Sequence, residues 1–335
     1  MSGETLSLNA NTCLLLPSDT ERRLTFREAF ERAWPQCRAL LADPDRAPGF
    51  LLAALDRWGR VTVQWLDPAD LHARHAVIGR HTQCQLRVQG DDAVSLRHVL
   101  ASAWLANGRP RLRLMDLRTP EGLELEDGSG GAGLSTDGSS FVRLGRSDLL
   151  CLCRGADPWA SELEAAWESI PPREFAPLPS ESPRVRVRPR LRLLSLGSDQ
   201  GAESTLVVAL SAPVELADLP VEPRTALGVL RLRDGRCCRL RADALDRGVL
   251  VGRSDRCALE ATELLDSCGS VSRVHLALVR DPMGLWAVDT ASTNGTRFDG
   301  RSSRVFSLKG VVELDLGGQL TLRWTPQSTE DVSCD

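Results

Sequence analysis

The chain has 335 residues, of which 42% are hydrophobic and 26% are charged, with a formal net charge of -4. This length favours two globular domains, and the apolar content excludes a chain that is disordered throughout. The nearly neutral charge gives no overall attraction to nucleic acid or to an anionic membrane. Lys309 is the only lysine beside forty arginines, a bias typical of a GC-rich bacterial genome.

The cysteines and the N-terminus favour a cytoplasmic protein. The ten cysteines are scattered and form no CxxC pairs, which is typical of reduced thiols. The N-terminal sequence MSGETLSLNANTCLLLP has no basic region and only a short apolar run. We therefore expect neither a signal peptide nor membrane insertion.

Residues 1–48 are predicted to form an N-terminal extension with an amphipathic helix. Thr25 and Glu28 have the spacing of a capping box, and apolar residues of TFREAFERAW share one helical face. Pro35 is expected to interrupt the helix.

The segment 155–190 is predicted to contain a second helix and then a linker. Ser161 and Glu164 repeat the capping-box spacing at the start of SELEAAWESI. Six prolines follow between residues 171 and 189, a density that is typical of a semi-rigid linker.

Most of the remaining sequence consists of short strand-like runs divided by Gly, Asp and Asn. The predicted fold class is therefore mainly β, with two β-sandwich domains, a few short helices and a Pro-rich linker. The expected divisions are the extension 1–48, a first domain 49–154, the helix and linker 155–190, an extra strand-like segment 191–227, a second domain 228–325 and an acidic tail 326–335.

An internal repeat indicates two copies of one β domain. HAVIGRHTQCQLRV at 75–88 matches GVLVGRSDRCALEA at 248–261, AVSLRHVLA matches SVSRVHLAL, and MDLRTPEGLEL matches VDTASTNGTRF. The three matched blocks occur in one order along the chain, which indicates duplication.

The second copy resembles the forkhead-associated (FHA) domain, a β-sandwich that binds phosphothreonine peptides through loops at one end. The family pattern is present as Gly252-Arg253, Ser272-Arg273-Val274-His275 and Ser292-Thr293-Asn294-Gly295-Thr296. The resemblance implies phosphopeptide binding by Arg253, Ser272, Arg273, Thr293 and Asn294, with structural support from Gly252, His275 and Gly295. Taken alone, Asn294-Gly295 is typical of a two-residue hairpin turn.

The chemistry of phosphothreonine fits these residue types. A phosphate group on threonine has a charge of about -1.5 to -2 and three strong acceptor oxygens, so its site needs a fixed guanidinium and short hydroxyl donors. Arg253 and Ser272 supply both. We expect His275 to brace the loops rather than to contact the ligand.

The first copy resembles a degenerate FHA domain, whose matching site consists of Arg80, Ser95, His98 and Glu121. Leu96 replaces the second arginine of the pattern, and moving the arginine to Arg97 sends it to the other strand face. Pro120 and Glu121 replace the Thr-Asn pair. We expect the Glu121 carboxylate to pair with Arg80, and the domain to serve interdomain packing or a contact that needs no phosphate.

Three other functions have weaker support. A hydrolase built on Ser272, His275 and Asp289 would need Ser and His on one face, yet strand residues three apart lie on opposite faces. The three histidines of LHARHAVIGRH do not converge on a metal ion, and RVRVRPRLRL has no aromatic residue for stacking on bases. We therefore expect no catalysis, no metal or other cofactor and no nucleic-acid partner.

The predicted function is a non-catalytic, phosphothreonine-dependent adaptor in bacterial Ser/Thr kinase signalling. Its partners would be phosphothreonine-containing proteins, either substrates of a kinase or the kinase itself. The alternative is a phosphate-independent scaffold that uses FHA-like sandwiches for constitutive protein contacts. Thr20 and Thr329, near the two ends, are candidate phospho-acceptors for such a site.

Overall fold

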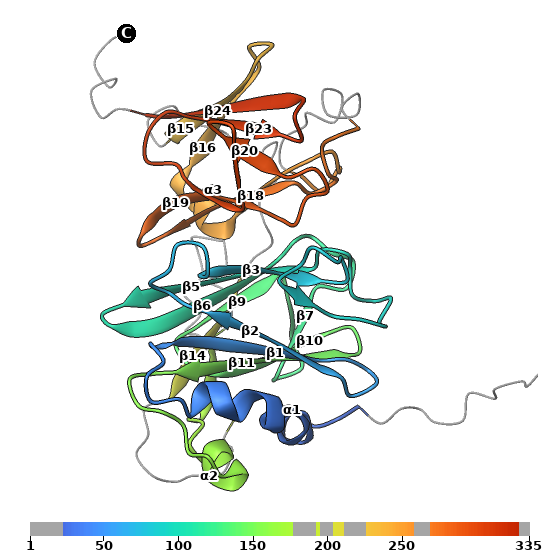
Figure 1. Ribbon diagram of the computed structural model, residues 1–335, viewed down its shortest axis with the longest axis vertical. Helices are drawn as coiled ribbons and strands as arrows, with labels where there is room; N and C mark the ends of the chain where they lie inside the picture. The colour runs from blue at the N-terminus through green and yellow to red at the C-terminus, as the bar shows by residue number, and fades with distance from the viewer. Residues whose placement is uncertain (1–22, 177–191, 195–203, 211–225, 258–268, 328–335) are drawn as a thin grey trace, which may run out of the picture.

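The computed structural model describes residues 23–176, 192–194, 204–210, 226–257 and 269–327. In these ranges the protein forms two β-sandwiches stacked one on the other (Figure 1), and the predicted mainly β fold is confirmed. None of the helices in these ranges has the length and apolarity needed to span a bilayer. Most of the Pro-rich linker, the end of the acidic tail, Thr20 and Thr329 lie outside the described residues.

The first sandwich has an outer and an inner sheet. The outer sheet has the order β2-β1-β11-β10-β7-β8 and consists of β1 (Gly49–Leu55), β2 (Val61–Leu66), β7 (Leu123–Leu125), β8 (Gly130–Gly131), β10 (Ser140–Leu144) and β11 (Ser147–Arg154). The inner sheet has the order β13-β12-β14-β9-β6-β5-β3-β4 and consists of β3 (His75–Gly79), β4 (Leu86–Arg87), β5 (Val99–Ala106), β6 (Arg109–Asp116), β9 (Gly133–Thr136), β12 (Arg173–Ala176), β13 (Arg192–Leu194) and β14 (Thr205–Ala209).

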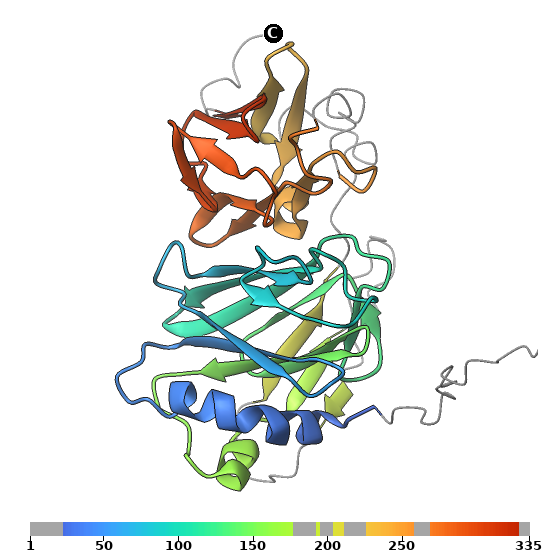
Figure 2. The ribbon, with the colours of Figure 1, turned by 45° about the vertical axis from the view of Figure 1, so that its right-hand side comes forward.

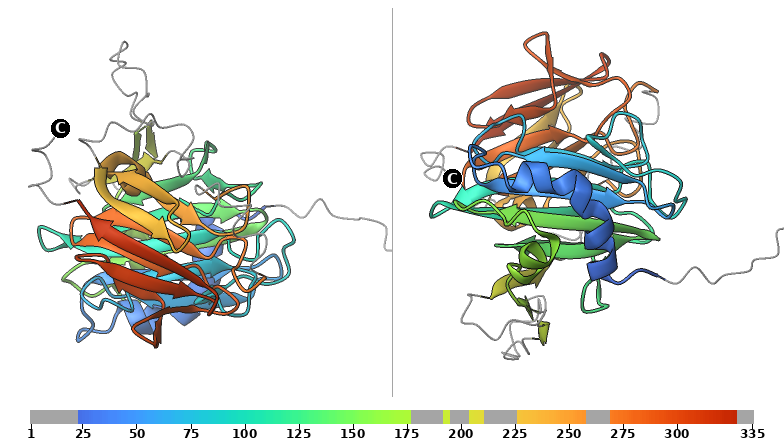
Figure 3. Two further views of the ribbon diagram at one scale, coloured as in Figure 1. Left: turned by 90° about the horizontal axis from the view of Figure 1, so that it is seen from above. Right: turned by 60° about the horizontal axis from the view of Figure 1, so that its bottom comes forward.

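Strand β1 is apolar along its whole length because both of its faces are covered. Side chains alternate across a strand, and every residue of GFLLAAL is buried. Phe50 and Leu52 pack between the two sheets, whereas Leu51 and Ala53 pack in the cluster formed with helix α1 (Phe26–Leu41). Helix α1 lies across the outer face of this sheet (Figure 3).

Helix α1 begins as predicted but ends later. Thr25 and Glu28 form the capping box, with the Glu28 N–H donating to Thr25 Oγ1 at 3.2 Å. The prediction that Pro35 interrupts the helix is wrong, since the helix continues to Leu41. Pro35 lies on the exposed face, where water can reach the carbonyl group that loses its helical hydrogen bond.

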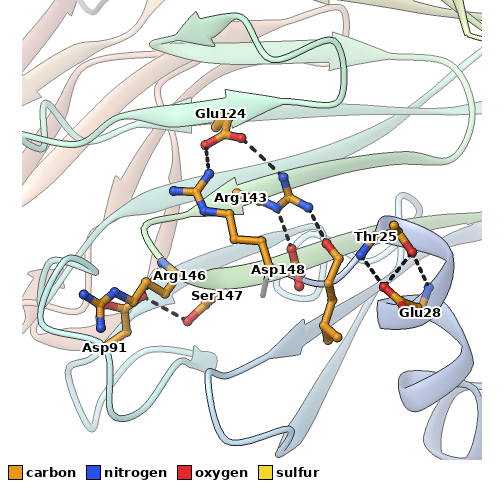
Figure 4. A network of polar contacts seen from close by, with 10 residues as sticks. Thr25, Glu28, Asp91, Glu124, Arg143, Arg146, Ser147 and Asp148 are labelled. Atoms are coloured by element: carbon orange, nitrogen blue, oxygen red, sulfur yellow. Dashed lines mark hydrogen bonds and ion pairs between the residues drawn. The ribbon is translucent and has the colours of Figure 1, made fainter. Parts of the chain in front are cut away.

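A polar network anchors the start of α1 to the first sandwich (Figure 4). Arg143 donates to Asp148 Oδ1 at 3.0 Å and to the carbonyl oxygen of Leu24 at 2.6 Å. Glu124 accepts from both Arg143 (3.3 Å) and Arg23 (2.8 Å). The N-terminal helix is therefore fixed to the strands of the first sandwich.

Helix α2 (Leu163–Glu168) is shorter than predicted. Its N-cap is Glu162, whose side chain makes no capping hydrogen bond, so the capping box predicted at Ser161 is wrong. Glu164 instead accepts a hydrogen bond from Arg27 Nη2 in α1 at 2.6 Å. Glu164 therefore pairs with Arg27 of α1 and does not complete a capping box at the start of α2.

The segments after residue 154 add strands to the first sandwich. Strand β12, within the segment predicted to be linker, pairs in parallel with β14, and β14 pairs with β9 of the inner sheet. Arg173 of β12 is almost fully buried and donates to Glu126 Oε2 at 2.6 Å. Residues 173–176 are thus part of the sandwich, and the segment 191–227 supplies β13 and β14.

The second sandwich also has two sheets. Its outer sheet has the order β16-β15-β24-β23-β20-β21 and consists of β15 (Ala226–Leu232), β16 (Cys237–Arg241), β20 (Thr296–Phe298), β21 (Arg301–Ser303), β23 (Val312–Leu316) and β24 (Leu320–Pro326). Its inner sheet has the order β17-β18-β19-β22 and consists of β17 (Val249–Val251), β18 (Leu276–Asp281), β19 (Gly284–Asp289) and β22 (Val305–Ser307). Helix α3 (Ala242–Arg247) leads into β17.

The two sandwiches have the same strand order. The outer sheet β2-β1-β11-β10-β7-β8 matches β16-β15-β24-β23-β20-β21, and β3-β5-β6-β9 matches β17-β18-β19-β22. The three matched sequence blocks cover parts of matching strands and the loops beside them. The strand order therefore agrees with the duplication that the sequence indicates.

The inner sheets of the two sandwiches face each other (Figure 2) and share one apolar cluster. Matching positions of matching strands supply it, namely Val77, Leu100 and Met115 from the first sandwich and Leu250, Ala277 and Val288 from the second. Each sandwich thus buries the same face against the other.

Buried polar groups also join the sandwiches. Arg74 forms an ion pair with Asp281 in which both side chains are almost fully buried. Arg113 donates to the carbonyl oxygens of Asp246 (2.7 Å) and Arg280 (2.9 Å). Separating the sandwiches would leave these groups without their protein partners, so the interface favours one fixed arrangement.

Replacing Asp281 by Asn should lower the free energy of unfolding of the full chain by about 3 kcal/mol, because Arg74 would remain buried without its counter-charge. The control Asp246→Asn removes an exposed ion pair with Arg280 and should change it by less than about 1 kcal/mol. Urea denaturation measures both values. A loss no larger for Asp281→Asn than for the control would contradict this description of the interface.

Candidate functional site

Three loops meet at one end of the second sandwich. The first, 252–257, follows β17, the second, described from residue 269, precedes β18, and the third, 290–295, joins β19 to β20. Because β19 and β20 belong to different sheets, the third loop crosses from one sheet to the other. The hairpin that Asn294-Gly295 suggests by itself is therefore wrong: of the two residues, only Gly295 has a positive φ, of 75°.

Gly252 allows the first loop to approach the second. A Cβ atom at this position would lie 2.2 Å from the carbonyl oxygen of Arg273 and 2.9 Å from that of Ser272. The N–H groups that follow use the same carbonyls, with Arg253 N donating to Ser272 O at 3.1 Å and Ser254 N donating to Arg273 O at 2.8 Å. The end of β17 is thus joined to the second loop through backbone contacts that leave no room for a side chain.

Arg253 is held by its Nε atom, which donates to the carbonyl oxygen of Val271. The side chain is half-buried, and no acidic group among the described residues forms an ion pair with it. Within the described ranges, its two terminal nitrogens have no hydrogen-bond partner. Arg273, next to Ser272, is exposed and likewise has no ion-pair partner among the described residues.

Ser272 and Asn294 connect the second and third loops. Ser272 is only 7% exposed, and its Oγ atom accepts a hydrogen bond from the Thr293 N–H at 3.0 Å. This bond uses the hydroxyl as an acceptor and leaves its O–H free to donate. Asn294 is exposed and donates through Nδ2 to the Ser270 carbonyl oxygen at 2.7 Å.

His275 is fully buried and bridges the same two loops. Its Nδ1 atom accepts from the Ser272 N–H at 3.1 Å, so the proton lies on Nε2, which donates to the Gly295 carbonyl oxygen at 3.2 Å. Burial lowers the pKa of His275 and keeps the ring neutral. The ring does not bond to the Ser272 hydroxyl, so the geometry does not assemble the nucleophile-and-base pair that a hydrolase needs.

Asp289 is a supporting residue that the motif analysis did not assign to the site. It is almost fully buried, and its carboxylate accepts from the Ser292 N–H (2.7 Å), the Ser292 hydroxyl (2.6 Å) and the Thr296 hydroxyl (2.7 Å). These bonds fix both ends of the third loop. The signal in the sequence was the Asp that lies six residues before Gly295 and has a match in the first copy.

The first sandwich keeps the supporting frame of the site. A Cβ atom on Gly79 would lie 2.4 Å from the Leu96 carbonyl oxygen, and Arg80 N donates to Ser95 O at 3.0 Å. His98 accepts from the Ser95 N–H at 3.1 Å and contacts the Gly122 carbonyl oxygen through Nε2 at 2.9 Å. The contacts that shape the loops are therefore the same in both sandwiches.

The groups that would face a ligand differ in the first sandwich. Pro120 has no N–H with which to reproduce the bond of Thr293 to the serine hydroxyl. Arg80 Nη1 pairs with Asp92 at 3.1 Å, so the predicted pair between Arg80 and Glu121 is wrong, and Glu121 is exposed. The Arg80 guanidinium thus pairs with Asp92, in the segment between β4 and β5, and not with Glu121, in the loop between β6 and β7.

The three histidines of LHARHAVIGRH do not gather into a metal site within the described residues. His75 is buried against Ser102, with its Nδ1 atom 2.8 Å from the hydroxyl, and burial lowers its pKa to about 3. Within the described ranges, no three His, Cys, Asp or Glu side chains lie together as a metal ion would require. Most of the arginine-rich stretch 184–193 lies outside the described residues.

No family model and no curated protein matches the chain. Similar solved structures include one from an analysis of phosphothreonine-dependent FHA domain interactions (25% identity, 30% of this chain and 97% of that chain, TM-score 0.24). Others are the FhaA FHA domain in complex with the intracellular domain of Rv3910 (26%, 29% and 98%, 0.24) and FHA-1 of Mycobacterium tuberculosis Rv1747 (24%, 31% and 100%, 0.26). The similarity to FHA domains covers about 30% of the chain.

Gly252→Ala should lower the free energy of unfolding by about 1–3 kcal/mol and displace the second loop, because the new methyl group meets a backbone carbonyl that cannot move alone. Gly310→Ala is the control, since a Cβ atom there meets nothing within 4 Å, and its effect should stay within about 1 kcal/mol. Urea denaturation gives both values. Equal stability of the two variants would show that the close approach is not a constraint.

Proposed function

We propose that the second sandwich binds phosphothreonine in partner proteins, and that the protein acts as a non-catalytic adaptor in bacterial Ser/Thr kinase signalling. The observation that carries the proposal is the rim formed by Arg253, Ser272 and Asn294. Each side chain comes from a different loop and is bonded to the backbone of the second or third loop, and no described carboxylate forms an ion pair with Arg253.

The rim offers the donors that a phosphate group needs. The terminal nitrogens of Arg253 supply a positive charge and directed N–H groups, and the Ser272 hydroxyl supplies a short donor. Arg273, next to Ser272 on the second loop, adds another guanidinium, which is exposed. Asn294, held by its bond to Ser270, is proposed to contact the backbone of a peptide that crosses the rim.

The expected affinity suits reversible signalling. Each hydrogen bond to a charged group contributes about 1.5–3 kcal/mol, and ordering a flexible peptide offsets part of this gain. Two or three such bonds together with backbone contacts correspond to a dissociation constant on the order of 1 μM.

The proposed partners are kinase substrates or a kinase that carries phosphothreonine, in the cytoplasm. The first sandwich is proposed to need no phosphate, because Arg80 is paired with Asp92 and Pro120 lacks the N–H group. Its large apolar contact with the second sandwich favours a packing role. A scaffold that ignores phosphate is the alternative, and the peptide experiment separates the two.

The test is binding of the full chain to a fluorescent phosphothreonine peptide library and to its unphosphorylated counterpart, followed by fluorescence anisotropy. We expect binding to the phosphorylated peptides only, weakened at least about tenfold by Arg253→Gln or Ser272→Ala. Arg80→Gln is the matched control in the first sandwich and should leave the affinity unchanged.

Two results would contradict the proposal. Equal binding of phosphorylated and unphosphorylated peptides would favour the scaffold, and a loss of binding in Arg80→Gln alone would move the site to the first sandwich. The urea unfolding midpoint of each variant separates loss of a contact from loss of the fold, since Arg253 also bonds to Val271.

A further inference from the structure

Arg97 of the first sandwich reaches the third loop of the second sandwich. Its Nε atom donates to the carbonyl oxygen of Ala291 at 2.8 Å. Ala291 lies between Asp289, which fixes the start of the loop, and Thr293, whose N–H bonds to Ser272. A residue outside the second sandwich therefore contacts the segment that shapes the proposed phosphate site.

Ala291 has a backbone conformation that its surroundings must maintain. Its φ is 61°, in the left-handed region, which costs a residue with a Cβ atom about 1–2 kcal/mol. The residue is only 2% exposed and belongs to the apolar cluster between the sandwiches. The loop shape thus depends on contacts made across the interface.

The environment of Arg97 indicates a placed group rather than a solvated surface charge. The side chain is half-buried, and its Nη2 atom is buried without a hydrogen-bond partner among the described residues. Burial lowers the pKa of Arg97, while the nearby Asp289 carboxylate raises it. Burying a guanidinium at this position costs free energy, and the hydrogen bond to the Ala291 carbonyl oxygen offsets part of that cost.

A reciprocal contact exists on the other side. Arg256 of the second sandwich donates from Nη1 to the carbonyl oxygen of Arg118 at 3.1 Å. Arg118 matches Ala291 in the repeat and also has a positive φ, of 58°. The loop between β6 and β7, which contains Arg118, matches the third loop of the second sandwich. Each sandwich therefore contacts the matching loop of the other, but only the loop of the second sandwich contains the Thr-Asn pair.

We propose that the first sandwich positions the phosphate-binding loop of the second, with Arg97 as the positioning residue. The bond to Ala291 holds the loop in the conformation that directs the Thr293 N–H to Ser272 and keeps Asn294 at the rim. This role deepens the proposed function and rests on it for its effect on affinity. The effect on the loop itself does not need a ligand.

The experiment compares Arg97→Leu, Arg97→Lys and the control Arg304→Leu in the full chain. Arg304 makes the same kind of bond across the same interface, from Nη1 to the Gln83 carbonyl oxygen at 3.0 Å, and among the described residues its guanidinium makes no hydrogen bond to the third loop. Hydrogen–deuterium exchange of peptides covering 290–295 is measured without ligand, and phosphothreonine-peptide affinity is measured by anisotropy.

We expect Arg97→Leu to speed exchange in 290–295 and to weaken peptide binding roughly five- to tenfold, because a charged donor to the loop is lost. Arg97→Lys keeps a charged donor and should restore part of both, and Arg304→Leu should change neither. Unchanged exchange in Arg97→Leu, or equal effects of Arg304→Leu, would overturn the proposal. Absence of peptide binding by the wild type would instead overturn the proposed function, and the exchange data would still decide the role of Arg97.

Discussion

The buried imidazole of His275 is the contact on which the shape of the proposed site depends. It joins the N–H of Ser272 to the carbonyl group of Gly295 and so fixes the second loop against the third. A neutral ring is required, because Nδ1 must accept a backbone hydrogen bond, and complete burial favours that state. Without this bridge, Ser272 and the Thr-Asn pair would belong to independent loops.

In the first sandwich, the contacts that shape the loops are kept although some of the residues that would bind a ligand differ. His98 makes the matching bridge, and Gly79 makes the matching close approach, so both loops keep their form. Of the residues that would face a phosphate, Arg80 and Ser95 are kept, whereas Leu96 and Pro120 stand in place of Arg273 and Thr293. The same loop contacts are therefore kept with different side chains at the ends of the loops. The shared fold of the two sandwiches does not by itself imply the same ligand.

Much of the fold was predictable from local sequence, because strand-forming runs, turn residues and the repeated blocks are local patterns. The helix break at Pro35 was wrong because burial decides which face of a helix tolerates proline. The linker assignment missed β12, since its pairing with β14 involves residues distant in sequence. The hydrogen bond between Arg97 and Ala291 could not be predicted from local motifs for the same reason, since the two residues are distant in sequence and only the tertiary structure brings them together.

We propose that phosphothreonine contacts the second sandwich and not the first. The most direct measurement is a titration of the isotope-labelled full chain with a phosphothreonine peptide, followed by amide NMR. We expect shifts at Ser272, Thr293 and Asn294, with none at Ser95 or Glu121. Equal shifts with the unphosphorylated peptide, or shifts confined to the loops of the first sandwich, would contradict it.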